Sequence, residues 1–124
     1  MKVMVFVKAT QDTEAGVPPT AEAMEAMGKY NEALMAAGTV KIETGGGLKP
    51  TRFAKRVRFS GKGPMVIDGP FTETKEVVAG FALWEVESME EAIAWAKKSP
   101  MPADSEVDIR PLYSLEDFAA WEQS

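Results

Sequence analysis

Two segments of the chain are apolar on both faces of a predicted strand. They are residues 2–8 and residues 72–86. Successive side chains of a strand point to opposite faces, so a strand with apolar residues at odd and even positions is expected to be buried on both sides. The two faces carry Val3, Val5 and Val7 against Met4 and Phe6 in the first segment, and Phe81 and Leu83 against Ala82 and Trp84 in the second.

Two other segments show the spacing of amphipathic helices. The first starts after the N-cap candidate Thr20 and runs to about Ala37, where Gly38 suits the position that ends a helix. The second starts at Ser88, which forms a capping-box pattern with Glu91, and ends before residue 100. Both helices are expected to place an apolar stripe against the sheet.

The remaining elements are shorter. We predict strands over residues 39–44, 52–60, 65–67 and 105–112, and loops or turns over residues 9–19, 45–50, 60–64 and 68–70. The glycines at 45–47 are expected to break the strand pattern. A short terminal helix is predicted to start at Ser114, with Phe118 and Trp121 on its packing side.

The resulting order, β-α-β-β-β-β-α-β-α, predicts an α+β domain with an antiparallel sheet. Two helices can cover only one face of such a sheet. The first strand and the long strand are apolar on both faces, so the second face needs a cover that this chain does not supply. We therefore predict a homodimer in which two copies pack sheet against sheet around a two-fold axis.

The composition and net charge of the chain argue against some classes of binding partner. A chain of 124 residues suits a single domain over 1–124. A net charge of −5 and a pI near 4.8 argue against nucleic acid and against an anionic membrane, since either is met by a basic face. The apolar start is too short for a signal peptide or a membrane span. We expect a cytoplasmic protein.

The chain contains neither cysteine nor histidine. The chain therefore cannot form a disulfide, a thiolate metal site or a cysteine nucleophile. It also lacks histidine, the commonest general base. Acid–base chemistry would have to use Asp, Glu, Lys or Tyr. No spacing of carboxylates points to a metal ion, so we expect neither a metal nor another cofactor.

The densest polar cluster lies at residues 68–76, directly before the long strand. Asp68 opens an Asp-Gly-Pro turn, where it either caps the turn or acts as a base in a pocket. Glu73 and Lys75 would share one face of an extended segment, with Glu76 on the other. These three residues either form a structural ion-pair network or polarise a substrate and hold an anion.

Three further residues are candidates for substrate binding. Arg110 suits bidentate carboxylate binding, either to a ligand or within the protein. Trp84 and Tyr30 either line an aromatic pocket between sheet and helix or pack in the core, where the tyrosine hydroxyl needs a partner. The basic stretch over residues 52–62 is either an anion-binding strand or a charged edge strand.

The string Asp-Gly-Pro-Phe-Thr-Glu-Thr-Lys-Glu at 68–76, followed by Val-Ala-Gly-Phe at 78–81, resembles the signature of the YCII-related, DGPF-domain family. Residues 90–96 and 107–112 continue the likeness. The resemblance implies a ferredoxin-like fold that dimerises into an α/β barrel. The wider superfamily includes isomerases, monooxygenases and dechlorinating enzymes that act on small, often aromatic, molecules. A His–Asp pair proposed for some members cannot exist here, because the chain lacks histidine.

Three functions follow as hypotheses, of which one is an assembly role with no ligand. The first is a cofactor-independent enzyme for a small molecule, with a pocket between sheet and helices near the dimer seam. Asp68, Glu73 or Glu76 would transfer protons, and Lys75 or Arg110 would hold a substrate anion. The second is a non-catalytic ligand-binding or regulatory module that uses the same pocket, a setting also suggested by family members encoded near sigma factors.

Overall fold

A computed structural model of the chain describes residues 1–72 and 76–123. Its main sheet has four antiparallel strands in the order β2-β5-β1-β6. The strands are β1 (Lys2–Lys8), β2 (Lys41–Gly47), β5 (Val78–Glu85) and β6 (Val107–Pro111). With α2 (Ala21–Ala37) after β1 and α3 (Met89–Lys97) after β5, this is the ferredoxin-like arrangement, and a second unit is inserted between β2 and β5.

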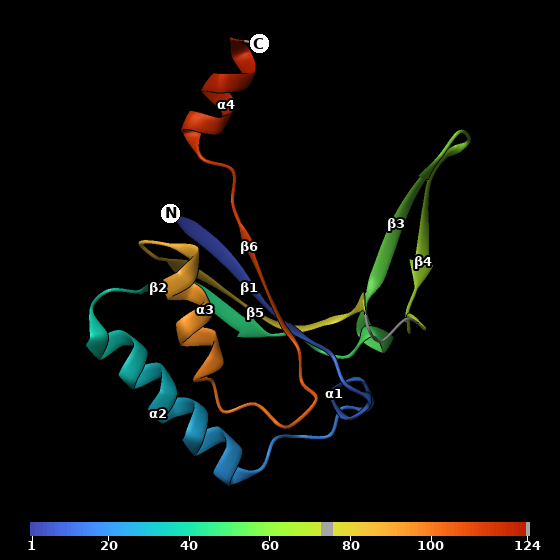
Figure 1. Cartoon of the computed structure of the whole chain (residues 1–124). Coiled ribbons are helices and arrows are strands. Elements are labelled where there is room, and N and C mark those ends of the chain that lie inside the picture. The colour runs from blue at the N-terminus through green and yellow to red at the C-terminus, as the bar shows by residue number, and fades with distance from the viewer. Residues whose placement is uncertain (73–75, 124) are drawn as a thin grey trace.

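The core lies between the sheet and the two long helices (Figure 1). Leu34 of α2 and Ala92 of α3 are fully buried against Val3, Val5 and Trp84 of the central strands. Both helices therefore cover the same face of the sheet. Thr20 and Ser88 accept backbone hydrogen bonds as N-caps, and Gly38 ends α2 in the left-handed conformation, as predicted. The predicted capping box is only half formed, because the Glu91 carboxylate accepts from the backbone N–H of Glu87 and not of Ser88.

The strand register confirms that the central strands are apolar on both faces. Met4 pairs with Leu83 and Phe6 pairs with Phe81, and all four side chains lie on the face opposite the helices. These four residues are only partly buried, whereas Val3 on the helix-covered face is fully buried. We call the side of the sheet that carries these four residues the open face.

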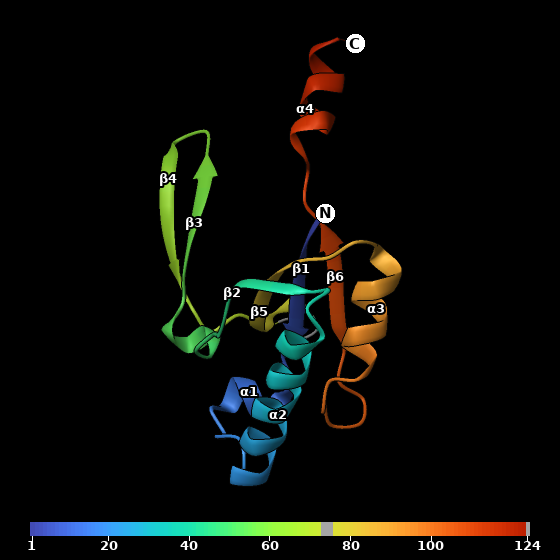
Figure 2. The same ribbon diagram turned by 90° about the vertical axis from the view of Figure 1, so that its left-hand side faces the viewer.

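Two elements extend away from this body as arms (Figure 1 and Figure 2). The first is a two-stranded sheet of β3 (Lys55–Ser60) and β4 (Gly63–Asp68), preceded by the 3-10 turn η1 (Thr51–Phe53). The second is the terminal helix α4 (Leu115–Glu122), which begins at the N-cap Ser114 as predicted. Phe118 and Trp121 lie on one side of α4, where their rings contact each other and Tyr113. They are still 47% and 54% exposed, so this side of the helix does not pack on the main core.

Three other predictions need correction. The loop predicted over residues 9–19 contains the short helix α1 (Gln11–Ala15), capped by reciprocal hydrogen bonds between Thr10 and Thr13. The predicted strand 52–60 begins with the 3-10 turn η1 and becomes extended only at residue 55. The long strand begins at Val78 rather than at residue 72, and the stretch 73–75 lies outside the described residues.

The glycines at 45–47 continue β2 instead of ending it. They pair with β5, from Gly45 opposite Ala82 to Gly47 opposite Gly80. A Cβ at Gly45 would lie 2.9 Å from the backbone oxygen of Phe81, so a larger residue would push the two strands apart there. Neighbouring-strand pairing therefore overrides the low strand propensity of glycine.

Candidate functional sites

The Asp-Gly-Pro-Phe turn is tied to the body by a network centred on Thr51. The backbone N–H and the hydroxyl of Thr51 donate to the two carboxylate oxygens of Glu14, at 2.9 and 2.5 Å. The backbone N–H of Phe71 in turn donates to the Thr51 hydroxyl oxygen at 3.0 Å. Thr51 is buried, so this network joins α1, η1 and the turn in a site from which most water is excluded.

Gly69 packs too closely against η1 to be replaced by another residue. A Cβ at this position would lie 1.7 Å from the Thr51 backbone oxygen, which would force the two segments apart. Its N–H donates to the backbone oxygen of Ala54 at 2.9 Å. The glycine of the signature thus serves close packing, and the turn is held at a defined position beside η1.

A cavity of about 590 Å³ lies beside this turn, and we call it the DGPF cavity. Two carboxylate residues, Asp68 and Glu76, line it together with the cation of Arg56, whose guanidinium lies 3.9 Å from the centre of the Phe71 ring. Asp68 pairs with Lys55 at 2.7 Å, but the two side chains are 73% and 64% exposed. The pair is therefore screened by water, unlike the buried Glu14–Thr51 contact.

A second cavity, of about 680 Å³, lies between the sheet and α2, and we call it the sheet–helix cavity. Tyr30 and Trp84 line it, and they also pack in the core, where Trp84 is buried and Tyr30 is half-buried against it. Glycines 45–47 and Gly80 contribute backbone instead of side chains, and the other walls are mainly apolar. The remaining lining residues include Val5, Val7, Met27, Asn31, Met35, Ile42, Ser99 and Met101.

Tyr30 places a polar group in the wall of the sheet–helix cavity. Its hydroxyl donates to the backbone oxygen of Trp95 at 2.6 Å, and the two rings meet edge to face at 6.3 Å between centroids. Partial burial raises the pKa of Tyr30 above its ordinary value of about 10. The phenol therefore stays neutral, and its oxygen keeps a lone pair that can accept a hydrogen bond from a ligand.

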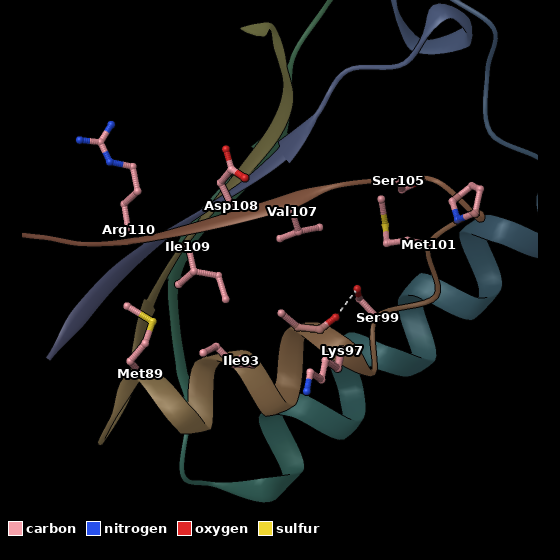
Figure 3. A pocket seen from close by; sticks show the side chains of 12 residues that line it. Met89, Ile93, Lys97, Ser99, Met101, Ser105, Val107, Asp108, Ile109 and Arg110 are labelled. Carbon is pink, nitrogen blue, oxygen red and sulfur yellow. Dashed lines mark hydrogen bonds between the residues drawn. The ribbon is translucent and has the colours of Figure 1, made fainter. Parts of the chain in front are cut away.

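A third hollow lies between α3 and β6, and it separates Arg110 from the other candidates (Figure 3). Val107 and Ile109 point from β6 toward α3, whereas Asp108 and Arg110 project from the other side of the strand. Arg110 pairs in register with Met4, so it belongs to the open face of the sheet. The neighbouring carboxylate of Asp108 lies 3.5 Å from the Lys8 ammonium.

The site residues predicted from the sequence therefore lie in three separate parts of the structure. Asp68 and Glu76 share the DGPF cavity, Tyr30 and Trp84 share the sheet–helix cavity, and Arg110 lies with neither pair. Glu73 and Lys75 lie outside the described residues. The two cavities are near neighbours, because Gly47, the last residue of β2, lines the sheet–helix cavity and the next residue, Leu48, lines the DGPF cavity.

Sequence reasoning missed Glu14 and Thr51. The signal was the pair of threonines at 10 and 13, whose spacing permits a capping box and so a short helix that carries Glu14. Nothing in the local pattern marks Thr51, because its role depends on contacts with residues 37 positions earlier and 20 positions later.

No group of three or more Asp or Glu residues suited to a metal ion occurs within residues 1–72 and 76–123. Over the same residues, no helix is long and apolar enough to cross a membrane.

Comparison with known families accounts for the signature and the topology together. The family model described as the YCII-related domain matches residues 1–116. The chain belongs to the YCII-related family. The match includes the Asp-Gly-Pro-Phe turn, both cavities and the complete four-stranded sheet of this YCII-related chain.

Two known proteins are similar to this chain, one in sequence and one in structure. An uncharacterized protein of Rhizobium meliloti (strain 1021) is 39% identical over 67 residues, which are 52% of this chain and 54% of that protein. The chain thus spans about half the length of this curated relative. A solved structure, the 5-chloro-2-hydroxyhydroquinone dehydrochlorinase from Burkholderia phenoliruptrix AC1100 in complex with 2,5-dihydroxybenzoquinone, is 19% identical with a TM-score of 0.47, over 94% of this chain and 99% of that one.

Proposed function

We propose that this YCII-related chain binds a small, largely apolar aromatic molecule in the sheet–helix cavity, without a cofactor. The observation that carries the proposal is the composition of the cavity wall. Apolar and aromatic side chains surround about 680 Å³, a volume within the usual range for small-molecule sites, and few polar groups interrupt them. Such a wall favours a ligand with one or two hydrogen-bonding groups on an apolar ring.

The polar groups of the cavity suit that ligand class. The neutral Tyr30 phenol keeps an acceptor lone pair, and Asn31 offers both a donor and an acceptor. Among the described residues that line the cavity, none is an acid or a base, so a charged ligand group would have no counter-ion there. A phenol or an aryl ketone fits this set better than an aromatic carboxylate does.

The test is an NMR titration of the full chain, labelled with ¹⁵N, against phenols, aryl ketones and aromatic carboxylates. We expect the amides of glycines 45–47 and the Trp84 indole to shift with the neutral compounds. Ala96→Met adds bulk to the cavity wall and should abolish the shifts. Ala94→Met, on the exposed side of the same helix, should leave them unchanged. Equal binding by both variants would overturn the assignment of this cavity.

We also propose a catalytic role as the second candidate function, because two carboxylates converge on the DGPF cavity. Asp68 and Glu76 line it, and Glu73 is expected nearby in sequence. In this reading these carboxylates transfer protons, and Lys75 or Arg56 holds a substrate anion, whereas Arg110 lies on the open face of the sheet. The enzyme would use carboxylate acid–base chemistry at a site next to the aromatic cavity.

Turnover separates the two functions. Once a ligand is found, its conversion by the wild type is measured by mass spectrometry and compared with that by Asp68→Asn and Glu76→Gln. Loss of conversion with retained binding supports the enzyme, and Glu90→Gln on exposed α3 serves as the control. Binding without conversion by the wild type favours the ligand-binding or regulatory module.

We propose in addition that the predicted homodimer forms through the open face, in which case Arg110 would lie near the seam. Met4, Phe6, Phe81 and Leu83 form the apolar surface for this contact. Leu83→Asp should convert the dimer to a monomer in light scattering after size exclusion, whereas Ala36→Asp on exposed α2 should not. A wild-type monomer at micromolar concentration would contradict this dimer. A cytoplasmic location remains a prediction.

A further inference from the structure

Both arms expose large apolar side chains to water. On the hairpin β3–β4, Phe59 is 83% exposed and Val66 is 68% exposed. On α4, Leu115 is 86% exposed and Phe118 is 47% exposed. An isolated two-stranded hairpin and an isolated helix of eight residues are both marginal in water, so each arm requires a surface to pack on.

The arms extend beyond the sheet on the same side of the body, but they stay apart from each other in both views (Figure 1 and Figure 2). Each of them therefore reaches past its own core. A second copy related by a two-fold axis would present its own pair of arms, and each contact between unlike arms would then occur twice.

The two arms are complementary in shape and chemistry. The register of the hairpin places Val57, Val66, Phe59 and Pro64 together on one face. The rings of Tyr113, Phe118 and Trp121 contact one another in a cluster at α4, with centroids 4.7 to 5.8 Å apart. A cluster of rings and an apolar strand face are surfaces that bury each other well.

The charges of the two arms are opposite. Residues 55–68 carry the cations Lys55, Arg56, Arg58 and Lys62 against one acid, Asp68. Residues 115–122 carry Glu116, Asp117 and Glu122 and no Lys or Arg. In a chain with a net charge of −5, this concentration of cations on the hairpin is distinctive, and it matches the acidic helix of another copy.

We propose that α4 of one copy packs on the β3–β4 hairpin of a second copy, and reciprocally, so that the arms are exchanged across the dimer. This inference rests on the proposed dimer but adds a contact outside the open faces. The apolar face around Phe59 receives the α4 rings, and the α4 acids pair with Lys55, on that same face, and with the turn residue Lys62. Arg56 and Arg58 lie on the opposite face of the hairpin. The exchange also fixes the base of the hairpin, where Arg56 and Asp68 line the DGPF cavity.

Cross-linking tests the exchange directly, because the natural chain has no cysteine. The single variants Gly61→Cys, in the hairpin turn, and Ala119→Cys, on α4, keep the proposed contact rings; they are prepared separately, mixed and treated with a flexible bismaleimide. A heterodimer that joins residue 61 to residue 119 is expected, as identified by mass spectrometry. Glu25→Cys, at an exposed position of α2, replaces Ala119→Cys in the control and should give no such product. Absence of the 61–119 product would overturn the exchange.

Sedimentation equilibrium provides the second measurement. Phe118→Ser should raise the dimer dissociation constant about tenfold, equivalent to about 1.4 kcal/mol. Ala119→Ser, the neighbouring control on α4, should change it less than twofold. Added salt should also weaken the dimer, since the arm contact includes exposed charges. If Leu83→Asp disrupts the dimer while Phe118→Ser has no effect, the open-face dimer stands and the arm exchange is wrong.

Discussion

The two neighbouring cavities are built in opposite ways. Regular elements enclose the sheet–helix cavity, and its wall combines apolar side chains with bare backbone from four glycines. Turns and the base of a hairpin enclose the DGPF cavity, and its wall contains two carboxylates and an arginine. The first depends on packing of the core, whereas the second depends on a few specific hydrogen bonds around Thr51.

This difference shows how binding and chemistry can be separated within one small domain. An apolar cavity on a rigid scaffold supplies affinity for a ring, and a polar turn next to it supplies groups that can be changed without disturbing the core. Substitutions at the turn should therefore affect the DGPF cavity alone. The predictions below test that independence.

The largest effect is expected at Gly69. Gly69→Ala places a methyl group where the Thr51 backbone lies, so we expect the free energy of unfolding to fall by about 3 kcal/mol or more. Gly61→Ala, in the hairpin turn with no atom within 4 Å of the new Cβ, should change it by less than about 0.5 kcal/mol. Urea denaturation measures both values. Equal stability of the two variants would contradict the close packing of the turn.

Thr51→Val should have the next largest effect. It removes the hydroxyl that joins the Glu14 carboxylate to the Phe71 N–H, so we expect a loss of about 2 kcal/mol in unfolding free energy. Thr44→Val, at an exposed position, is the matched control. Ligand shifts at glycines 45–47 should persist in Thr51→Val. Their loss would mean that the two cavities are coupled.

Tyr30→Phe tests the polar group of the sheet–helix cavity. Loss of the hydrogen bond to the Trp95 oxygen should cost about 1 kcal/mol. Because burial raises the folded-state pKa of Tyr30, the folded state retains its proton above the ordinary pKa near 10. The resulting stabilisation is full below pH 10 and is lost as the pH rises through the folded-state pKa. The decline in stability above pH 10 should be shallower in Tyr30→Phe, and an unchanged slope would contradict this assignment.

Lys55→Met should have the smallest effect on stability. The Lys55–Asp68 pair is exposed, so its loss should change the unfolding free energy by less than about 1 kcal/mol. A much larger loss would mean that the DGPF cavity depends on this pair as well as on Thr51. The difference in unfolding free energy between the wild type and Lys55→Met, measured at low and at high salt, shows how much of the pair's contribution salt screens.

Much of the fold could be predicted from local patterns. Thr20, Ser88 and Ser114 cap helices where their spacing indicates, and the two-faced strands pair side by side at the centre of the sheet. These features depend on neighbouring residues and on the period of the side chains. The prediction failed at glycines 45–47, where the adjacent strand β5 determines the conformation.

The candidate site was less predictable than the fold. Tyr30 and Trp84 meet in one cavity because helical and strand periodicity both direct them into the same layer. Arg110 is directed to the opposite face by the same alternation, once β6 is placed beside β1. Glu14 was not predicted as a site residue, because the periodicity of a five-residue helix is too short to distinguish it from a polar loop.

By itself, the sequence determined the family, the main helices and strands, the absence of histidine and cysteine chemistry, and the polar cluster that begins at Asp68. Only the tertiary structure decided that the carboxylates and the aromatic residues line two different cavities, that Glu14 and Thr51 hold the turn, and that two apolar arms project from the body. The physical reason is range: local patterns depend on contacts within a few residues, whereas the sites depend on backbone segments brought together from distant parts of the chain.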